Sequence, residues 1–311
     1  MDNLILSLNI ILPLFVLMAV GYLARRLKML DDKTIRVMNN LVFRLFLPIL
    51  LCKNIMDSTE GNISGGVFIF AGVGVVALYL LLFLIIPLIE KDNTKRGVMI
   101  QAIGRSNYAL FGIPLVQSIF PGADTSIASL LVAITIPLYN VLSVIALEVY
   151  RGGKTDVGKI IKNIVTNPLI IGSIIGIILL KTKLPLAPFI TTSIGNLAQI
   201  ASPLALFMLG AFFEFSKVGH NARQLTICVI GKLVISPLIF LSLAVWLGFR
   251  GPELASLMVV FGAPTAVNSF TMAQQMGGDE ELAGQQVVFS SALSTITVFL
   301  FVFAAKSFNL F

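Results

Sequence analysis

Two polar segments, residues 104–114 and 262–270, interrupt long apolar stretches of this chain at points where their side chains could bind a ligand. The polar side chains that they offer are Arg105, Ser106, Asn107, Thr265, Asn268 and Ser269. Hydroxyls, carboxamides and a guanidinium all donate hydrogen bonds, and together they suit the oxygens of a carboxylate. The two segments therefore predict a binding site for a small organic anion rather than a set of catalytic groups.

Both segments also contain residues that interrupt helices. These residues are Gly104, Gly112, Pro114, Gly262 and Pro264. Proline has no N–H and clashes with the preceding turn, so carbonyls before it lose their partners. A helix broken in this way presents half-helix ends, whose N-termini attract anions and whose C-termini attract cations. The alternative is a pair of proline kinks without a ligand, and the polar residues at both breaks favour a site.

Three cations, Arg44, Arg105 and Lys232, lie well inside apolar stretches, at depths of roughly 12–16 Å for helices that rise 1.5 Å per residue. A cation near the centre of a bilayer costs about 2.5–3.5 kcal/mol on insertion scales. Attraction of an anionic substrate would offset this cost. The presence of Arg44 and Lys232 is explained equally well if their side chains snorkel toward the membrane surface or donate to carbonyls that the helix breaks release. Arg105 lies within the first break itself and is the best candidate for direct contact.

No Asp or Glu lies near the middle of any apolar stretch, so a carboxylate-based proton relay or cation site is not expected. Amides and hydroxyls near Pro48 and Pro203 could still bind a coupling Na⁺ or support the site. The candidates for such an ion or support site are Asn40, Arg44, Asn196, Ser202 and Lys232. The single histidine, His220, and two apolar cysteines offer no metal site, and no cofactor is expected.

The elements that must position these residues are membrane helices. Of the 311 residues, 57% are hydrophobic and 12% are charged, about half the charge of a soluble domain. A surface so poor in charge must face lipid, where only helices and closed barrels satisfy the backbone, and long continuous apolar runs favour helices. We predict an all-α integral membrane protein with ten spans, at about 4–24, 33–52, 65–89, 97–120, 125–149, 160–180, 190–213, 222–248, 253–276 and 282–306.

The distribution of basic residues predicts the orientation of these spans. If the N-terminus lies outside, 14 basic residues fall on inner segments and five on outer ones, which satisfies the positive-inside rule. We therefore expect both termini outside, in the cell (inner) membrane. The N-terminal stretch has no basic start and no cleavage site, and it is expected to remain as the first span.

The chain also predicts two related halves, residues 1–150 and 151–311. Pro13 and Pro168, Gly21 and Gly176, and Pro48 and Pro203 are each separated by 155 positions. Because each unit holds five spans, an odd number, the second copy would enter the membrane from the opposite side as an inverted repeat. The broken spans are then the fourth of each half.

The sequence resembles the auxin efflux carrier family, which includes plant auxin carriers and bacterial malate or malonate permeases. The resemblance rests on the element from Asn107 to Pro114, on Pro264 to Phe270, and on the following residues 277–282. It implies two inverted five-helix repeats whose broken spans 4 and 9 cross at their prolines, an NhaA-like and bile-acid-symporter-like fold. It also implies a scaffold domain (spans 1, 2, 6, 7), a transport domain (spans 3–5, 8–10), elevator-type motion and a homodimer. Arg105 departs from the plant carriers, which argues against an auxin-type substrate. The short loop between spans 5 and 6, which lacks the long segment of the plant members, resembles that of a bacterial or archaeal permease.

The expected function is secondary active transport of small organic anions, such as malate, malonate or auxin-like weak acids, with Na⁺ or H⁺ as the coupling ion. The alternative is an ion channel or a ligand-sensing membrane module. An internal inverted repeat favours alternating access over a channel, which usually gathers its spans around one axis by oligomerisation. An enzyme is not expected, because no nucleophile–base pair or in-membrane acid is present, and nothing points to nucleic acid.

Overall fold

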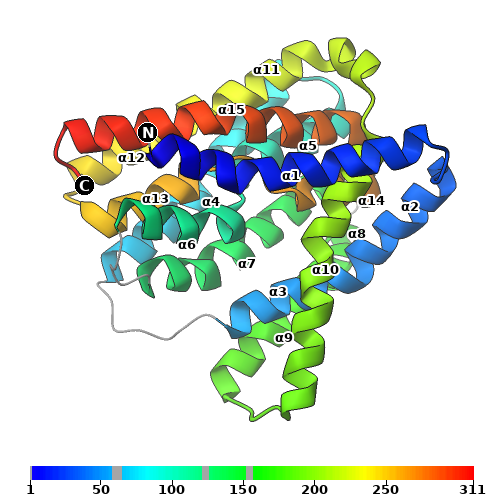
Figure 1. Cartoon of the computed structure of the whole chain (residues 1–311), viewed down its shortest axis with the longest axis horizontal. Helices are drawn as coiled ribbons and strands as arrows, with labels where there is room; N and C mark the ends of the chain where they lie inside the picture. Colours follow the sequence, from blue (N-terminus) through cyan, green and yellow to red (C-terminus); the bar gives the residue numbers. More distant parts are fainter. Residues whose placement is uncertain (1, 58–64, 121–125, 152–156) are drawn as a thin grey trace.

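A computed structural model of the chain describes residues 2–57, 65–120, 126–151 and 157–311, and these residues form helices joined by short connections (Figure 1). The first half contains α1 (Asp2–Arg26), α2 (Asp32–Leu41), η1 (Val42–Phe46), α3 (Leu47–Met56), α4 (Gly65–Ile89), α5 (Asn93–Gly104), α6 (Tyr108–Ile119) and α7 (Ser126–Val149). The second contains α8 (Val157–Val165), α9 (Pro168–Thr182), α10 (Pro188–Phe212), η2 (Phe215–Asn221), α11 (Ala222–Ile230), η3 (Gly231–Ile235), α12 (Ser236–Trp246), α13 (Gly251–Gly262), α14 (Asn268–Met276) and α15 (Glu280–Ser307).

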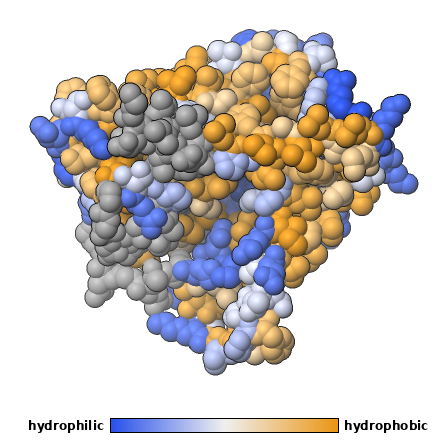
Figure 2. All heavy atoms as spheres, viewed as in Figure 1, coloured by the Kyte–Doolittle hydropathy of each residue, from blue (hydrophilic) through white to orange (hydrophobic). Residues whose placement is uncertain are grey.

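Six continuous helical segments in the described ranges are long and apolar enough to cross a membrane. They are Asp32–Met56, Gly65–Ile89, Leu130–Val149, Pro188–Phe212, Phe215–Trp246 and Glu280–Ser307. Many large apolar side chains on them are exposed, among them Leu84 and Leu88 of α4. Figure 2 shows apolar residues over much of one face, with hydrophilic residues in several places, among them the end where α1 meets α2. The chain is therefore an all-helical integral membrane protein, as its composition predicted.

The other four predicted spans have different forms. Residues 4–24 lie in α1, whereas 97–120 and 253–276 are each divided into two helices, α5 with α6 and α13 with α14. The range 160–180 is also divided, into the short α8 and the 15-residue α9. Pro168 is thus not inside a span: it opens α9, where its missing N–H is harmless, and Asn167 caps the helix by accepting from Leu169 N. Pro13, in contrast, lies inside α1.

Helices α1, α3, α9 and α10 pack on one another at unusually close glycine contacts. A Cβ placed on Gly21 of α1 would lie 2.0 Å from the carbonyl oxygen of Phe207 in α10. A Cβ on Gly176 of α9 would lie 2.9 Å from the carbonyl oxygen of Cys52 in α3. Both pairs of helices therefore approach at backbone distance, as is typical of small residues at membrane helix interfaces.

Two of the spanning segments contain a single π-helical turn, and each turn carries a cation. Arg44 lies in η1, between α2 and α3, and Lys232 lies in η3, between α11 and α12. A π-turn rotates the residues after it around the helix axis and frequently marks a functional position. The two cations differ in environment, because Arg44 is exposed whereas Lys232 is fully buried.

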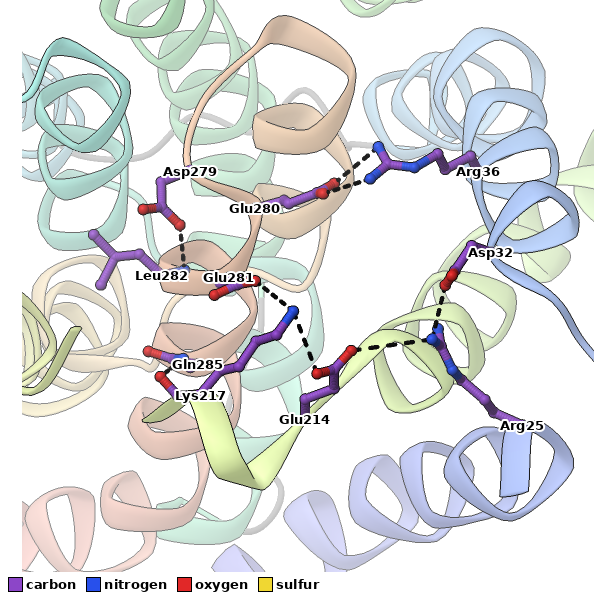
Figure 3. Close-up of polar contacts among 10 residues, drawn as sticks. All are labelled: Arg25, Asp32, Arg36, Glu214, Lys217, Asp279, Glu280, Glu281, Leu282 and Gln285. Atoms are coloured by element: carbon purple, nitrogen blue, oxygen red, sulfur yellow. Dashed lines mark hydrogen bonds and ion pairs between the residues drawn. The ribbon is translucent and has the colours of Figure 1, made fainter. Parts of the chain in front are cut away.

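The segments that join α1 to α2, α10 to α11 and α14 to α15 meet at one end of the helical assembly. Figure 3 shows Lys217 of η2 paired with Glu214 at 3.3 Å and with Glu281 at the start of α15 at 2.8 Å. Glu214 lies 4.0 Å from Arg25 at the end of α1, and Arg36 of α2 pairs with Glu280 at 2.8 Å. This network ties α1, α2, η2 and α15 together, and the two chain ends lie at the opposite end of the molecule (Figure 1).

Candidate functional site

The spans 97–120 and 253–276 cross each other at their interruptions. Ser106, between α5 and α6, forms an isolated antiparallel β-bridge with Thr265, between α13 and α14. The backbone N–H of Asn107 donates to the carbonyl oxygen of Pro264 at 2.8 Å. Backbone groups that the helix breaks leave unpaired thus find partners across the crossing, as groups buried in hydrocarbon must.

The position of the crossing corrects one prediction. Pro264 lies in the second break, but Gly112 and Pro114 lie inside α6, beyond the first break at residues 105–107. The spans therefore do not cross at both prolines. In the span 97–120 the crossing is formed instead by Ser106 and Asn107, which pair with the other break as in a β-strand. Gly104 allows α5 to end against the ring of Tyr79, because a Cβ at this position would lie 2.5 Å from that ring.

A cavity of about 370 Å³ lies beside the crossing. One part of its wall is formed by the two breaks together with the starts of α6 and α14. The rest is formed by side chains of α3, α7 and α10. The lining includes Arg105, Ser106, Asn107, Tyr108, Ala266, Val267, Asn268, Tyr139, Leu50, Asn54, Gln199, Ser202 and Pro203. The structure thus gathers four of the six predicted binding residues, Arg105, Ser106, Asn107 and Asn268, around one space large enough for a small ligand.

Arg105 supplies the positive charge of this cavity. Its side chain is only 4% exposed, and its Nη1 contacts the sulfur of Met272 in α14 at 2.8 Å. Among the described residues no carboxylate forms an ion pair with it, although a buried guanidinium without a counter-charge is costly. A cavity that presents such a group is suited to a ligand that carries the missing negative charge.

Two half-helix N-termini add to this positive potential. Helix α6 begins at Tyr108 and α14 at Asn268, both on the cavity wall, and no side chain caps either end. The side-chain nitrogen of Asn107, Nδ2, is buried and has no hydrogen-bond partner. The N–H groups of Ser269 and Phe270 in α14 already donate to the carbonyls of Ala266 and Val267, so it is mainly the helix dipoles that make these ends suited to an anion. An anion here would therefore meet a guanidinium, an amide and two helix starts.

Thr265 and Ser269 lie behind this wall rather than on it. Thr265 Oγ1 donates to the Ala102 carbonyl in α5 at 2.8 Å and accepts from Gln286 of α15 at 3.2 Å. Gln101 of α5 donates to the Ser269 carbonyl at 2.9 Å, and the Ser269 hydroxyl is buried without a partner. The side chains of Thr265 and Gln101 therefore join the half-helices to each other, whereas the side chain of Ser269 does not.

The five candidates for an ion or support site do not form one site. Only Ser202 lines the cavity, whereas Asn196 and Arg44 are exposed elsewhere. Asn40 donates to Gln275 of α14 at 2.9 Å. Lys232 is buried on the other side of the first break, where it donates to the hydroxyl of Ser106 at 2.5 Å.

Several residues of the site escape detection in the sequence. Tyr139, Asn54 and Gln199 line the cavity from spans with no break. Asn39 of α2 is fully buried, accepts from Thr271 of α14 at 2.8 Å and also donates to Gln274. A signal did exist for Asn39, because an amide inside an apolar span is expensive unless it is bonded.

A helical membrane protein with two crossed half-helix pairs beside a cavity that is mainly apolar but carries a few polar groups has the form of a membrane transporter, with its binding site where interrupted helices meet. The chain matches the model of the membrane transport protein family over residues 6–160 and 157–302, and it belongs to this family, which is the auxin efflux carrier family.

Three relatives that match nearly the whole chain are named as transporters. It is 25% identical over 304 residues to a "Putative malonate transporter" of Rhizobium meliloti, covering 93% of each chain. It is 23% identical to an uncharacterised transporter of Methanothermobacter thermautotrophicus, over 94% of this chain and 96% of that one. A further uncharacterised transporter, of Methanocaldococcus jannaschii, is 23% identical over 95% of this chain and 97% of the relative.

Proposed function

We propose that this membrane transport protein carries small organic anions, of the mono- or dicarboxylate class, by secondary active transport. The observation that carries the proposal is Arg105: a buried cation on the cavity wall that forms no ion pair with a carboxylate of the described residues. The uncapped starts of α6 and α14 lie beside it. Malonate is the first substrate to test, because the relative from Rhizobium meliloti carries malonate in its name.

The proposed binding mode follows from the donors on the wall. One carboxylate of the substrate accepts from the guanidinium of Arg105 and from the amide of Asn107, and Asn268 binds from the second break. Charge-assisted hydrogen bonds of this kind are about twice as strong as neutral ones. A second carboxylate would lie toward Gln199 and Ser202 of α10, which close the cavity from the other side.

We propose an inverted repeat of two five-span halves as the basis of alternating access. Its support is a pair of matching contacts: Gly21 with Phe207, and Gly176 with Cys52. Adding 155 to 21 gives 176, and subtracting 155 from 207 gives 52, so each contact is the counterpart of the other with the halves exchanged. This is what a pseudo-twofold axis in the membrane plane produces.

The same packing supports a scaffold of α1, α2–α3, α9 and α10 and a transport domain that holds both crossed spans. The cavity lies between these two groups, since α3 and α10 form one wall and the breaks form the other. Vertical movement of the transport domain against the scaffold would then expose the cavity to either side. The basic loops that gather around Lys217 would face the cytoplasm and both termini the outside of the cell.

Uptake of labelled malonate by proteoliposomes tests the proposal. We expect saturable uptake by the wild type and at least a tenfold loss of kcat/KM in both Asn107→Ala and Asn268→Ala. Asn196→Ala, the same change at an exposed position that does not line the cavity, serves as the control and should retain most of the activity. Wild-type rates in both cavity variants would refute the site, and flux that rises in proportion to concentration without saturation would indicate a channel instead.

A further inference from the structure

Lys232 is the most deeply buried cation of the described chain, and the fold brings it to the crossing. It lies in the π-turn η3 and has no exposed surface. The preceding Gly231 permits this approach, since a Cβ there would meet Ile103 of α5 at 3.0 Å. Lys232 does not line the cavity, so it is not placed to bind the substrate.

A short chain of hydrogen bonds joins the Lys232 ammonium to the end of α13. Its Nζ donates to Ser106 Oγ at 2.5 Å, and that hydroxyl donates to the carbonyl oxygen of Val260 at 2.5 Å. The hydroxyl of Tyr139 donates to the same carbonyl at 2.8 Å. Val260 lies in the last turn of α13, and Ser106 lies two residues beyond the end of α5. The ammonium is therefore located where two half-helices end.

The ends of α5 and α13 are the negative ends of their dipoles. Each is equivalent to roughly half an elementary charge, and the carbonyls of the last turn have no partners within the helix. Neutral hydroxyls donate to some of these carbonyls, and a positive charge placed near two such ends inside a membrane is favourable as well. Within the described part of the chain, Lys232 forms no ion pair with a carboxylate, so these carbonyl ends are the negative groups that remain to stabilise it.

We propose that the ammonium of Lys232 is a built-in cation that fills the position between the C-terminal ends of α5 and α13, so that this transporter needs no bound Na⁺ to complete its crossing. The two kinds of half-helix end then interact with charges of opposite sign. The N-termini of α6 and α14 face the cavity with Arg105 and receive an anion, whereas the C-termini of α5 and α13 face Lys232. The part of the proposal that concerns transport rests on the proposed function, and the part that concerns the crossing does not.

The first test removes the ammonium group of the Lys232 side chain and supplies a small alkylammonium ion from solution in its place. Lys232→Ala leaves a space that matches n-propylammonium, and we expect its Tm to be several degrees below that of the wild type and to rise with millimolar n-propylammonium chloride. The same salt should leave the Tm of the wild type and of Lys232→Met unchanged, because there the space is filled. A Lys232→Ala variant that responds to n-propylammonium no more than Lys232→Met does would overturn the proposal.

The second test uses the wild type alone and so does not depend on a variant that folds. Its Tm should be equal, at equal ionic strength, in NaCl and in choline chloride, and malonate uptake should differ less than twofold between the two salts. A sodium-specific rise in Tm, or uptake that requires Na⁺, would refute the built-in cation. Absence of malonate uptake in both salts would count against the proposed function, while the Tm comparison would still decide the role of Lys232.

Discussion

Ser106 and Thr265 pair as an antiparallel β-bridge at the point where the two interrupted spans cross. The bridge provides hydrogen-bond partners for backbone groups that the helix breaks release. The side chains of both breaks therefore remain free to make other contacts. Arg105, Asn107 and Asn268 face the cavity, whereas Ser106 also reaches back to Val260 and Lys232. One structural element thus separates the face proposed to bind an anion from the face proposed to hold the Lys232 cation.

Thr265→Val tests how much the side chains behind the bridge stabilise it. The near-isosteric change removes the donor to Ala102 and the acceptor for Gln286 while the site stays buried. We expect a loss of about 1–3 kcal/mol, the usual cost of leaving buried polar groups unpaired. Thermal unfolding in detergent measures it. Thr182→Val is the control, because that exposed hydroxyl bonds only within its own helix, and an equal loss in both variants would contradict the account.

The sequence located the breaks because glycine, proline and polar residues cluster there against an apolar background. It did not show that the first crossing point is Ser106 rather than Pro114, since strand pairing between residues far apart in the chain depends on three-dimensional approach. It also could not rank Arg44 against Lys232. Both are single cations in apolar spans, and only the packing of η1 and η3 exposes one and buries the other.

Gly21→Ala should weaken the contact between α1 and α10. The new Cβ would lie 2.0 Å from the Phe207 carbonyl oxygen, so the two backbones must separate. We expect a cost of about 1–3 kcal/mol, as for other overpacked interfaces. Gly72→Ala in α4 is the matched control, since its nearest neighbour lies at 3.7 Å and the helix should accept alanine without loss. Equal thermal stability of the two variants would contradict the close contact.

The Arg36–Glu280 pair, which joins α2 to α15, should contribute little at high salt. The two side chains meet at the polar end of the molecule, and Arg36 is 60% exposed. A double-mutant cycle with Arg36→Ala and Glu280→Ala should give a coupling of about 0.2–1 kcal/mol at low salt. In 1 M NaCl the Debye length falls to about 3 Å, so the coupling should nearly vanish. A coupling that does not change with salt would show that the pair acts through packing.

Glu90, at the end of α4, should make the protein less stable in acid. Burial alone would raise the pKa of its carboxyl, but hydrogen bonds from Asp92 N, Gln224 and Lys91 N outweigh it and lower the pKa below the usual 4.5. Because the folded pKa lies below the unfolded one, the stabilisation is present above pH 4.5 and is lost as pH falls through the folded value. Thermal unfolding between pH 6 and pH 3.5 should therefore change less in Glu90→Gln than in the wild type. Equal slopes would assign the acid sensitivity to other groups.

The affinity of carboxylates for the Arg105 cavity tests the central claim most directly. Isothermal titration of the purified protein with malonate, malate and a monocarboxylate identifies the tightest ligand, whose Kd is then measured for Arg105→Gln and Arg44→Gln. Both variants remove one arginine from an apolar span, but only Arg105 lines the cavity. We predict a Kd at least tenfold higher for Arg105→Gln, equivalent to about 1.4 kcal/mol or more, and an unchanged Kd for Arg44→Gln. An equal Kd for the wild type and Arg105→Gln would contradict the assignment of this cavity as the anion site.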